Sequence, residues 1–248
     1  MSLSNVSLTT VIKNQFHYKL KAYIGVFSSF VILQVFALLI TMSSSGGGYF
    51  SWDGIEISYS AYSSIGVFTL TIIWAFIQSI IMSSKTNWEK NFPFVGNHIS
   101  HDVSNFIFLL FMSMIAGILT VLSDFLLRVM IYYFFINENI YFYHSALTGQ
   151  ELLSGLTTVS LYLILFCAIG YLLGTITRLH RMMPVLLPAI IVGILISMAQ
   201  TQSNLFMQIL EFYYREGNTT VFIFKIIAPV LLLFFTSALI SSRVEVRK

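Results

Sequence analysis

Long apolar runs separated by short polar intervals dominate the pattern along this chain. A helix needs about 20 apolar residues to cross the hydrocarbon core of a bilayer. Six runs approach that length: 23–42, 61–82, 106–127 (or on to 135), 157–176, 184–202 and 221–240. Helices are expected because every backbone polar group in lipid must be satisfied within its own segment. The pattern predicts an all-α integral membrane protein with six transmembrane helices in one membrane domain.

The first 22 residues follow a different pattern, that of an amphipathic helix. Apolar residues recur at every fourth position and basic residues form a neighbouring stripe: Leu8, Ile12, Phe16 and Leu20, then Lys13, His17 and Lys21. Such a helix lies at a membrane surface with its apolar side in the lipid. The segment 1–22 is therefore predicted to be an interfacial helix on the cytoplasmic side. Either it only anchors the amino terminus or it also contacts a cytoplasmic partner.

Composition and charge support a membrane protein and give its orientation. The chain is 57% hydrophobic and 9% charged, against about 25% charged residues in an average soluble domain. Ten of the 13 basic residues fall in intervals on one side: Lys13, Lys19, Lys21, Lys85, Lys90, Arg178, Arg181, Arg243, Arg247 and Lys248. Basic residues collect on the cytoplasmic side, so both termini are predicted to be cytoplasmic. This distribution also explains the net charge of +3 without a nucleic-acid partner.

Signatures of catalysis are missing from the sequence. It has no phosphate-binding loop, no H-E-x-x-H metal motif and no G-x-S-x-G nucleophile motif. Its one cysteine, Cys167, lies in an apolar run. His98, His101 and Asp102 lack the further ligands of a metal site and the spacing of the common acyltransferase motif, so the two histidines are expected to be solvated loop residues. The chain is therefore expected to be no enzyme and to hold no cofactor or metal of its own.

Two features of the apolar runs have candidate roles. Asp124 and Arg128 have the spacing of a helical ion pair, and they lie roughly 27 and 33 Å beyond Phe106 at about 1.5 Å per residue. That depth predicts an ion pair at the outer boundary of the membrane; the alternative is a proton-coupled site. Gly170 and Gly174 form a G-x-x-x-G motif, which permits close packing of another helix.

The polar interval 83–105 mixes basic, acidic, histidine, proline and aromatic residues. A short helix bearing Trp88 and Glu89 is expected, followed by a bend at Phe92-Pro93-Phe94. Exposed aromatic residues beside a rigid bend are typical of a contact with a partner protein. The interval is therefore interpreted as a cytoplasmic coupling loop, and the alternative is an ordinary connection between helices.

These features together resemble the permease of a type-2 ABC exporter. The resemblance covers the topology of nearly the whole chain, and its motif is Phe92-Pro93-Phe94-Val95-Gly96-Asn97-His98 with Ser104-Asn105. It implies a contact with a separate ABC ATPase through Trp88, Glu89, Phe92, Pro93, Phe94 and His98. It also implies a membrane dimer with a second copy or a related permease, and ATP and magnesium bound in the ATPase. The short outer loops match a small bacterial form in the plasma membrane, without a large extracellular domain.

The function expected from this resemblance is export of an amphipathic cargo, such as an antimicrobial peptide, a lipid-like molecule or a drug. An ion-coupled secondary transporter that uses Asp124 is one alternative. A non-transporting sensor or scaffold subunit of an ABC complex is another. A membrane-embedded enzyme would need a polar cluster near the middle of the bilayer, and the sequence pattern does not assemble one.

Overall fold

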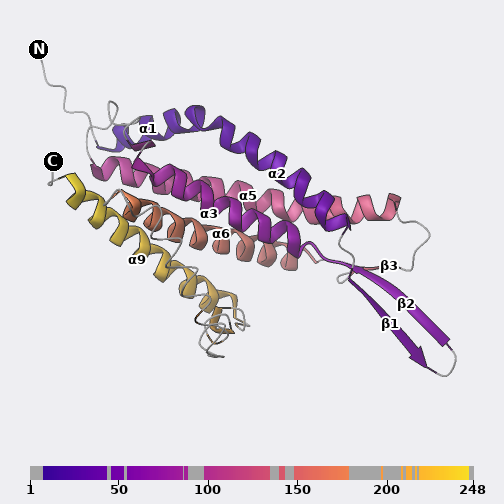
Figure 1. Cartoon of the computed structure of the whole chain (residues 1–248). Helices are drawn as coiled ribbons and strands as arrows, with labels where there is room; N and C mark the ends of the chain where they lie inside the picture. The colour runs from indigo at the N-terminus through magenta and orange to yellow at the C-terminus, as the bar shows by residue number, and fades with distance from the viewer. Residues whose placement is uncertain are drawn as a thin grey trace, which may run out of the picture. The chain divides into compact units, whose positions relative to one another are not determined.

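Long helices make up most of the described chain (Figure 1). This computed structural model describes residues 8–43, 46–52, 55–85, 87–88, 98–134, 140–142, 148–178, 197, 208, 211–213, 216 and 218–245. The helices are α1 (Leu8–Ala22), α2 (Ile24–Ser43), α3 (Ile65–Ser83), α5 (His98–Phe134), α6 (Gly149–Thr177) and α9 (Thr219–Glu245).

Five of these helices, α2, α3, α5, α6 and α9, are long and apolar enough to cross a membrane. Their length and composition confirm a predominantly helical, multi-pass membrane protein. The predicted fifth span, 184–202, lies outside the described residues except for Ser197. The count of six spans and the cytoplasmic position of the termini therefore stay predictions.

A small sheet departs from the predicted all-α fold. Strands β1 (Gly46–Trp52) and β2 (Ile55–Tyr62) pair antiparallel, and β3 (Ile140–Phe142) pairs parallel with β2. Because β2 continues to Tyr62, α3 begins at Ile65 and not at residue 61 as the sequence pattern predicts. The ladder satisfies backbone groups of the connections that it joins.

Side chains at the helix starts explain where two of the helices begin. Thr148 and Glu151 form a capping box at the start of α6: the Thr148 amide donates to Glu151 Oε2 at 2.7 Å, and the Glu151 amide donates to Thr148 Oγ1 at 3.4 Å. Asn218 accepts a bond from the Thr220 amide before α9. The capping box places the start of α6 before the predicted span 157–176.

The chain divides into two compact units. Unit 1 contains Met1–Lys21, Phe76–Phe111 and Ile164–Lys248, and unit 2 contains Ala22–Ala75 and Met112–Leu163. Helices α3, α5 and α6 each contribute residues to both units.

Unit 2 has an apolar core with a hydrogen-bonded polar cluster. The core is formed by Ala37, Leu38, Val67, Leu127 and Ile131. The amide of Gln34 on α2 donates to Thr71 Oγ1 on α3 at 2.9 Å, and Gln34 Oε1 accepts a bond from Ser123 on α5 at 2.9 Å. Polar side chains that bond across helices in this way hold membrane helices together.

Candidate functional site

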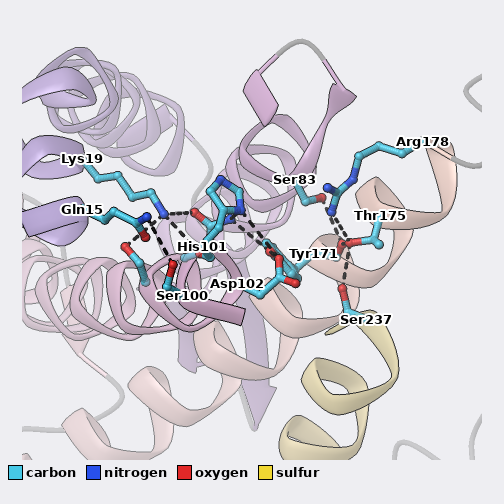
Figure 2. A network of polar contacts seen from close by, with 12 residues as sticks. Gln15, Lys19, Ser83, Ser100, His101, Asp102, Tyr171, Thr175, Arg178 and Ser237 are labelled. Atoms are coloured by element: carbon cyan, nitrogen blue, oxygen red, sulfur yellow. Dashed lines mark hydrogen bonds and ion pairs between the residues drawn. The ribbon is translucent and has the colours of Figure 1, made fainter. Parts of the chain in front are cut away.

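Unit 1 contains a cluster of buried polar side chains, drawn in Figure 2, and the ionisable residues Lys19, His101 and Asp102 are among them. Lys19 on α1 and His101 on α5 are each 2% exposed, and Asp102 on α5 is 8% exposed. Charged residues are rarely buried in soluble proteins, and within membrane proteins they mark functional sites by default. This cluster is therefore the candidate functional site. It is called the inner polar cluster and includes Gln15, Lys19, Ser83, Ser100, His101, Asp102, Tyr171, Thr175, Arg178 and Ser237.

Helix α1 contributes two side chains to the inner polar cluster, and both reach the first turns of α5. Lys19 Nζ donates to the His101 carbonyl at 3.3 Å, to Ser104 Oγ at 3.0 Å and to Asn105 Oδ1 at 2.5 Å. Gln15, one turn earlier on the same face of α1, donates to Ser100 Oγ at 3.4 Å. Figure 2 shows both side chains directed at α5. These bonds attach α1 to the start of α5.

The charge of Lys19 depends on opposing effects. Burial lowers the pKa of Lys19 to about 7, and attraction by the Asp102 carboxylate acts in the other direction. An ammonium group has three N–H donors, which matches the three acceptors around Nζ. The hydrogen bonds therefore favour the ammonium form, while burial brings its titration into the neutral pH range.

Tyr171 on α6 joins the same cluster through its hydroxyl group. The hydroxyl donates to Asp102 Oδ1 at 2.8 Å and accepts a bond from Asn105 Nδ2 at 3.0 Å. His101 Nδ1 lies 3.7 Å from the same carboxylate oxygen, Oδ1. Tyr171 is 1% exposed, and its hydroxyl group bonds to two side chains near the start of α5.

The end of α6 connects the cluster to α3 and α9. Ser83, the last residue of α3, donates to the Tyr171 carbonyl at 3.0 Å. Thr175 Oγ1 lies 2.7 Å from Ser237 Oγ on α9, and Arg178 Nη2 donates to Thr175 Oγ1 at 3.2 Å. Residues of α1, α3, α5, α6 and α9 thus form one connected set of hydrogen bonds (Figure 2).

The two glycines of the G-x-x-x-G motif lie where α6 approaches α3. A Cβ atom at Gly170 would lie 2.0 Å from Ser79 Oγ and 2.6 Å from the Phe76 carbonyl oxygen. At Gly174 it would lie 1.9 Å from Ser83 Oγ. The glycines therefore permit the close approach that brings Ser83 to the Tyr171 carbonyl.

An apolar pocket of about 490 Å³ adjoins the cluster between α5, α6 and α9. Its walls include Phe106, Leu231, Phe234 and Phe235, and Asp102 and Tyr171 also line it. The Phe106 and Phe234 rings are 4.4 Å apart between centroids, and the Tyr171 and Phe234 rings are 5.5 Å apart. The pocket thus combines an aromatic wall with one carboxylate.

The predicted coupling residues fall only in part within the described chain. Trp88 is half-buried, and His98 is the first residue of α5. Glu89, Phe92, Pro93 and Phe94 lie outside the described residues. Their role in coupling stays a prediction.

The expectation that His101 is a solvated loop residue is wrong. Helix α5 begins at His98, so the last eight residues of the predicted loop 83–105 are helical. His101 and Asp102 lie in the first turns of α5 and are buried there with side chains from α1 and α6. The sequence interpretation failed because polar residues before an apolar run are typical of a loop as well as of a buried helix start.

Asp124 and Arg128 belong to unit 2, whereas the residues of the inner polar cluster belong to unit 1. Arg128 Nη2 donates to Asp124 Oδ2 at 3.0 Å, and the two side chains are 25% and 24% exposed. A contact of this kind is a partly exposed helical ion pair. Its position at the outer boundary of the membrane stays a prediction.

No family model, curated protein or solved structure matches this chain. Within the described residues, no group of three histidine, cysteine, aspartate or glutamate side chains could hold a metal ion.

Proposed function

We propose that this chain is the membrane-spanning subunit of an ATP-driven exporter and that a separate ATPase docks at the connection between α3 and α5. The chain would provide the path for an amphipathic cargo, and ATP and magnesium would bind in the ATPase. The assembly would be a dimer of two such permeases, identical or related, in a bacterial plasma membrane. Type-2 ABC exporters, which the chain resembles, have this organisation.

The observation that supports this proposal best is the inner polar cluster beside that connection. Ser83 ends α3 just before the connection, and His101 and Asp102 lie just after it. Hydrogen bonds join these residues to α1, α6 and α9. A force applied to the connection would therefore act on all these helices in unit 1 together. A passive loop has no need of such buried bonds at both of its ends.

Unit 1 contains the residues on either side of the docking connection together with Lys19 on α1. The positive-inside pattern predicts that this connection and both termini are cytoplasmic. An ATPase in the cytoplasm would then meet residues that adjoin the inner polar cluster.

Co-purification with an ATPase tests the proposal directly. The tagged chain is expressed with the ATPase encoded beside its gene, purified in detergent and assayed for ATP hydrolysis. We expect a stoichiometric, ATP-hydrolysing complex that Trp88→Ala weakens, because Trp88 lies in the docking connection. Tyr132→Ala is the matched control, since Tyr132 is an exposed aromatic residue in the last turn of α5. If no ATPase co-purifies, or if both variants behave alike, the docking proposal is wrong.

A second variant examines the role of the cluster itself. Lys19→Met keeps the length of the side chain and removes the three hydrogen bonds to α5. The complex should then still assemble, because the docking connection is unchanged. ATP hydrolysis by the complex should change, since α1 would no longer follow α5. Unchanged hydrolysis in Lys19→Met would argue against transmission through the cluster.

An ion-coupled secondary transporter is the second candidate, and the cluster contains an observation in its favour. His101 Nε2 is buried and has no hydrogen-bond partner among the described residues, and its Nδ1 lies beside Asp102. A buried histidine and carboxylate in a membrane protein suit proton binding better than Asp124, which is a quarter exposed. Proton movement into vesicles that hold the chain alone, lost in Asp102→Asn, would favour this candidate over the ATP-driven one.

A further inference from the structure

The pocket between α5, α6 and α9 has the size and lining of a ligand site. Its volume of about 490 Å³ lies within the roughly 300–1,000 Å³ typical of small-molecule sites. The rings of Phe106, Tyr171, Phe234 and Phe235 form much of its wall. All of its lining residues belong to unit 1, and the charged residue among them is Asp102.

The carboxylate of Asp102 lacks a fixed countercharge in contact with it. Tyr171 and His101 both approach Oδ1, and a histidine carries charge only when it is protonated. Lys19 attracts the carboxylate, but it donates its hydrogen bonds to His101, Ser104 and Asn105. Among the described residues, no lysine or arginine forms an ion pair with Asp102.

A buried charge without a paired partner is costly, and a ligand can supply that partner. A cation beside the Asp102 carboxylate would complete the charge pairing at the wall of the pocket. The aromatic rings would contact the apolar part of the same ligand and would also attract its positive charge. An anion of equal size would meet the same apolar wall but would be repelled by the carboxylate.

We propose that this pocket binds a lipophilic cation, with its charge at Asp102 and its apolar body against Phe106, Phe234 and Phe235. The binding site depends only on the pocket and on the carboxylate. That such a cation is also the exported cargo is a further step, and this step depends on the proposed function.

The test measures binding to the full-length chain alone, in nanodiscs of zwitterionic lipid and without an ATPase. The probe is radiolabelled tetraphenylphosphonium, a lipophilic cation with aromatic rings. Tetraphenylborate, an anion of the same shape, is measured in a separate sample. We expect saturable binding of the cation and at least tenfold weaker binding of the anion, as a charge-assisted contact implies.

Two variants of the pocket and one control locate the site. Asp102→Asn keeps an oxygen that can accept the Tyr171 hydroxyl bond and should weaken cation binding about tenfold or more. Ala238→Phe places a ring within the pocket, which Ala238 lines, and leaves Asp102 unchanged. Because the ring fills the space for the ligand, saturable binding should be lost. Asp124→Asn removes a carboxylate elsewhere on α5 and should bind the cation like the wild type.

Several results would overturn the proposal. Non-saturable binding of the cation to the wild type would refute it. Binding of the anion as tight as that of the cation would refute it too. Equal binding by Asp102→Asn and Asp124→Asn, with both variants folded by size-exclusion chromatography, would also refute it. None of these results depends on an ATPase, so they are distinguishable from a failure of the complex to co-purify.

Discussion

Replacement of Gly174 by alanine tests the close packing of α6 against α3. The added Cβ would lie 1.9 Å from Ser83 Oγ, 2.7 Å from the Ile80 carbonyl oxygen and 3.1 Å from Ile80 Cα. The serine side chain can rotate away, but the backbone atoms of Ile80 move only if the helix moves. We therefore expect α6 and α3 to separate slightly at this position and the protein to lose stability.

The size of the loss follows from three contributions. Alanine is a better helix former than glycine by about 0.8–1 kcal/mol. Forcing a methyl group into a filled interface costs about 1–3 kcal/mol. Displacing Ser83 weakens its bond to the Tyr171 carbonyl, which contributes about 0.5–1.5 kcal/mol. The net free energy of unfolding should fall by roughly 0.5–3.5 kcal/mol.

Gly155 provides the matched control on the same helix. A Cβ at Gly155 would meet nothing within 4 Å, so Gly155→Ala should stabilise the chain by up to about 1 kcal/mol. Both variants are unfolded in mixed micelles of increasing SDS content and followed by far-UV circular dichroism. Adding Ser83→Ala to Gly174→Ala removes the contact between the new Cβ and Ser83 Oγ but leaves the contact with the Ile80 backbone. The double variant should therefore regain part of the lost stability.

Equal stability of Gly174→Ala and Gly155→Ala would show that α6 is not closely packed against α3 at Gly174. The same conclusion would follow if Ser83→Ala restored the stability of Gly174→Ala completely, because the backbone contact with Ile80 would then cost nothing.

Two further predictions concern ionisable groups. Because the pKa of Lys19 is lowered to about 7 from 10.5, the unfolded chain holds a proton that the folded chain releases between these values. The free energy of unfolding should therefore rise with pH from about 7 to 10.5. Unfolding titrations of Lys19→Met should lack this rise. If the free energy of unfolding rose equally with pH in the wild type and in Lys19→Met, the prediction would be wrong. For Asp124 and Arg128, a double-mutant cycle with alanine should give a coupling of about 0.3–0.5 kcal/mol, since both side chains are a quarter exposed. A coupling above about 2 kcal/mol would show a more buried pair than this geometry allows.

Hydropathy predicts where the apolar helices lie, because a helix needs about 20 apolar residues to cross a bilayer, but it does not predict the polar turns by which α5 and α6 begin before the predicted spans. Helix α2 spans Ile24–Ser43, one residue from the predicted 23–42. Strand β2 was not expected, although Ile55, Ile57, Tyr59 and Ala61 alternate with Glu56, Ser58, Ser60 and Tyr62 in the pattern of a strand. Asp53-Gly54, a dipeptide favoured in two-residue hairpin loops, precedes this alternation. A search for 20-residue apolar runs averages the hydropathy over many residues, so it misses an alternation with a period of two residues.

The inner polar cluster was harder to predict. One signal for Lys19 exists on α1: it follows Ile12 by seven positions and Phe16 by three, which places it on the apolar stripe. Lys13 and Lys21 lie off this stripe and are exposed. The partners of Lys19 on α5 could not be inferred, because a single sequence does not state which helices pack together.

The parallel pairing of β2 with β3 limits how two connections of unit 2 can move. Ser60, Ala61 and Tyr62 are in register with Ile140, Tyr141 and Phe142, so the segment before α3 is joined to the segment between α5 and α6. Successive residues of a strand face opposite sides, and a slip of one residue would exchange those sides. The two connections therefore cannot slide past each other gradually: they keep this register, or they separate by breaking the backbone bonds of the ladder.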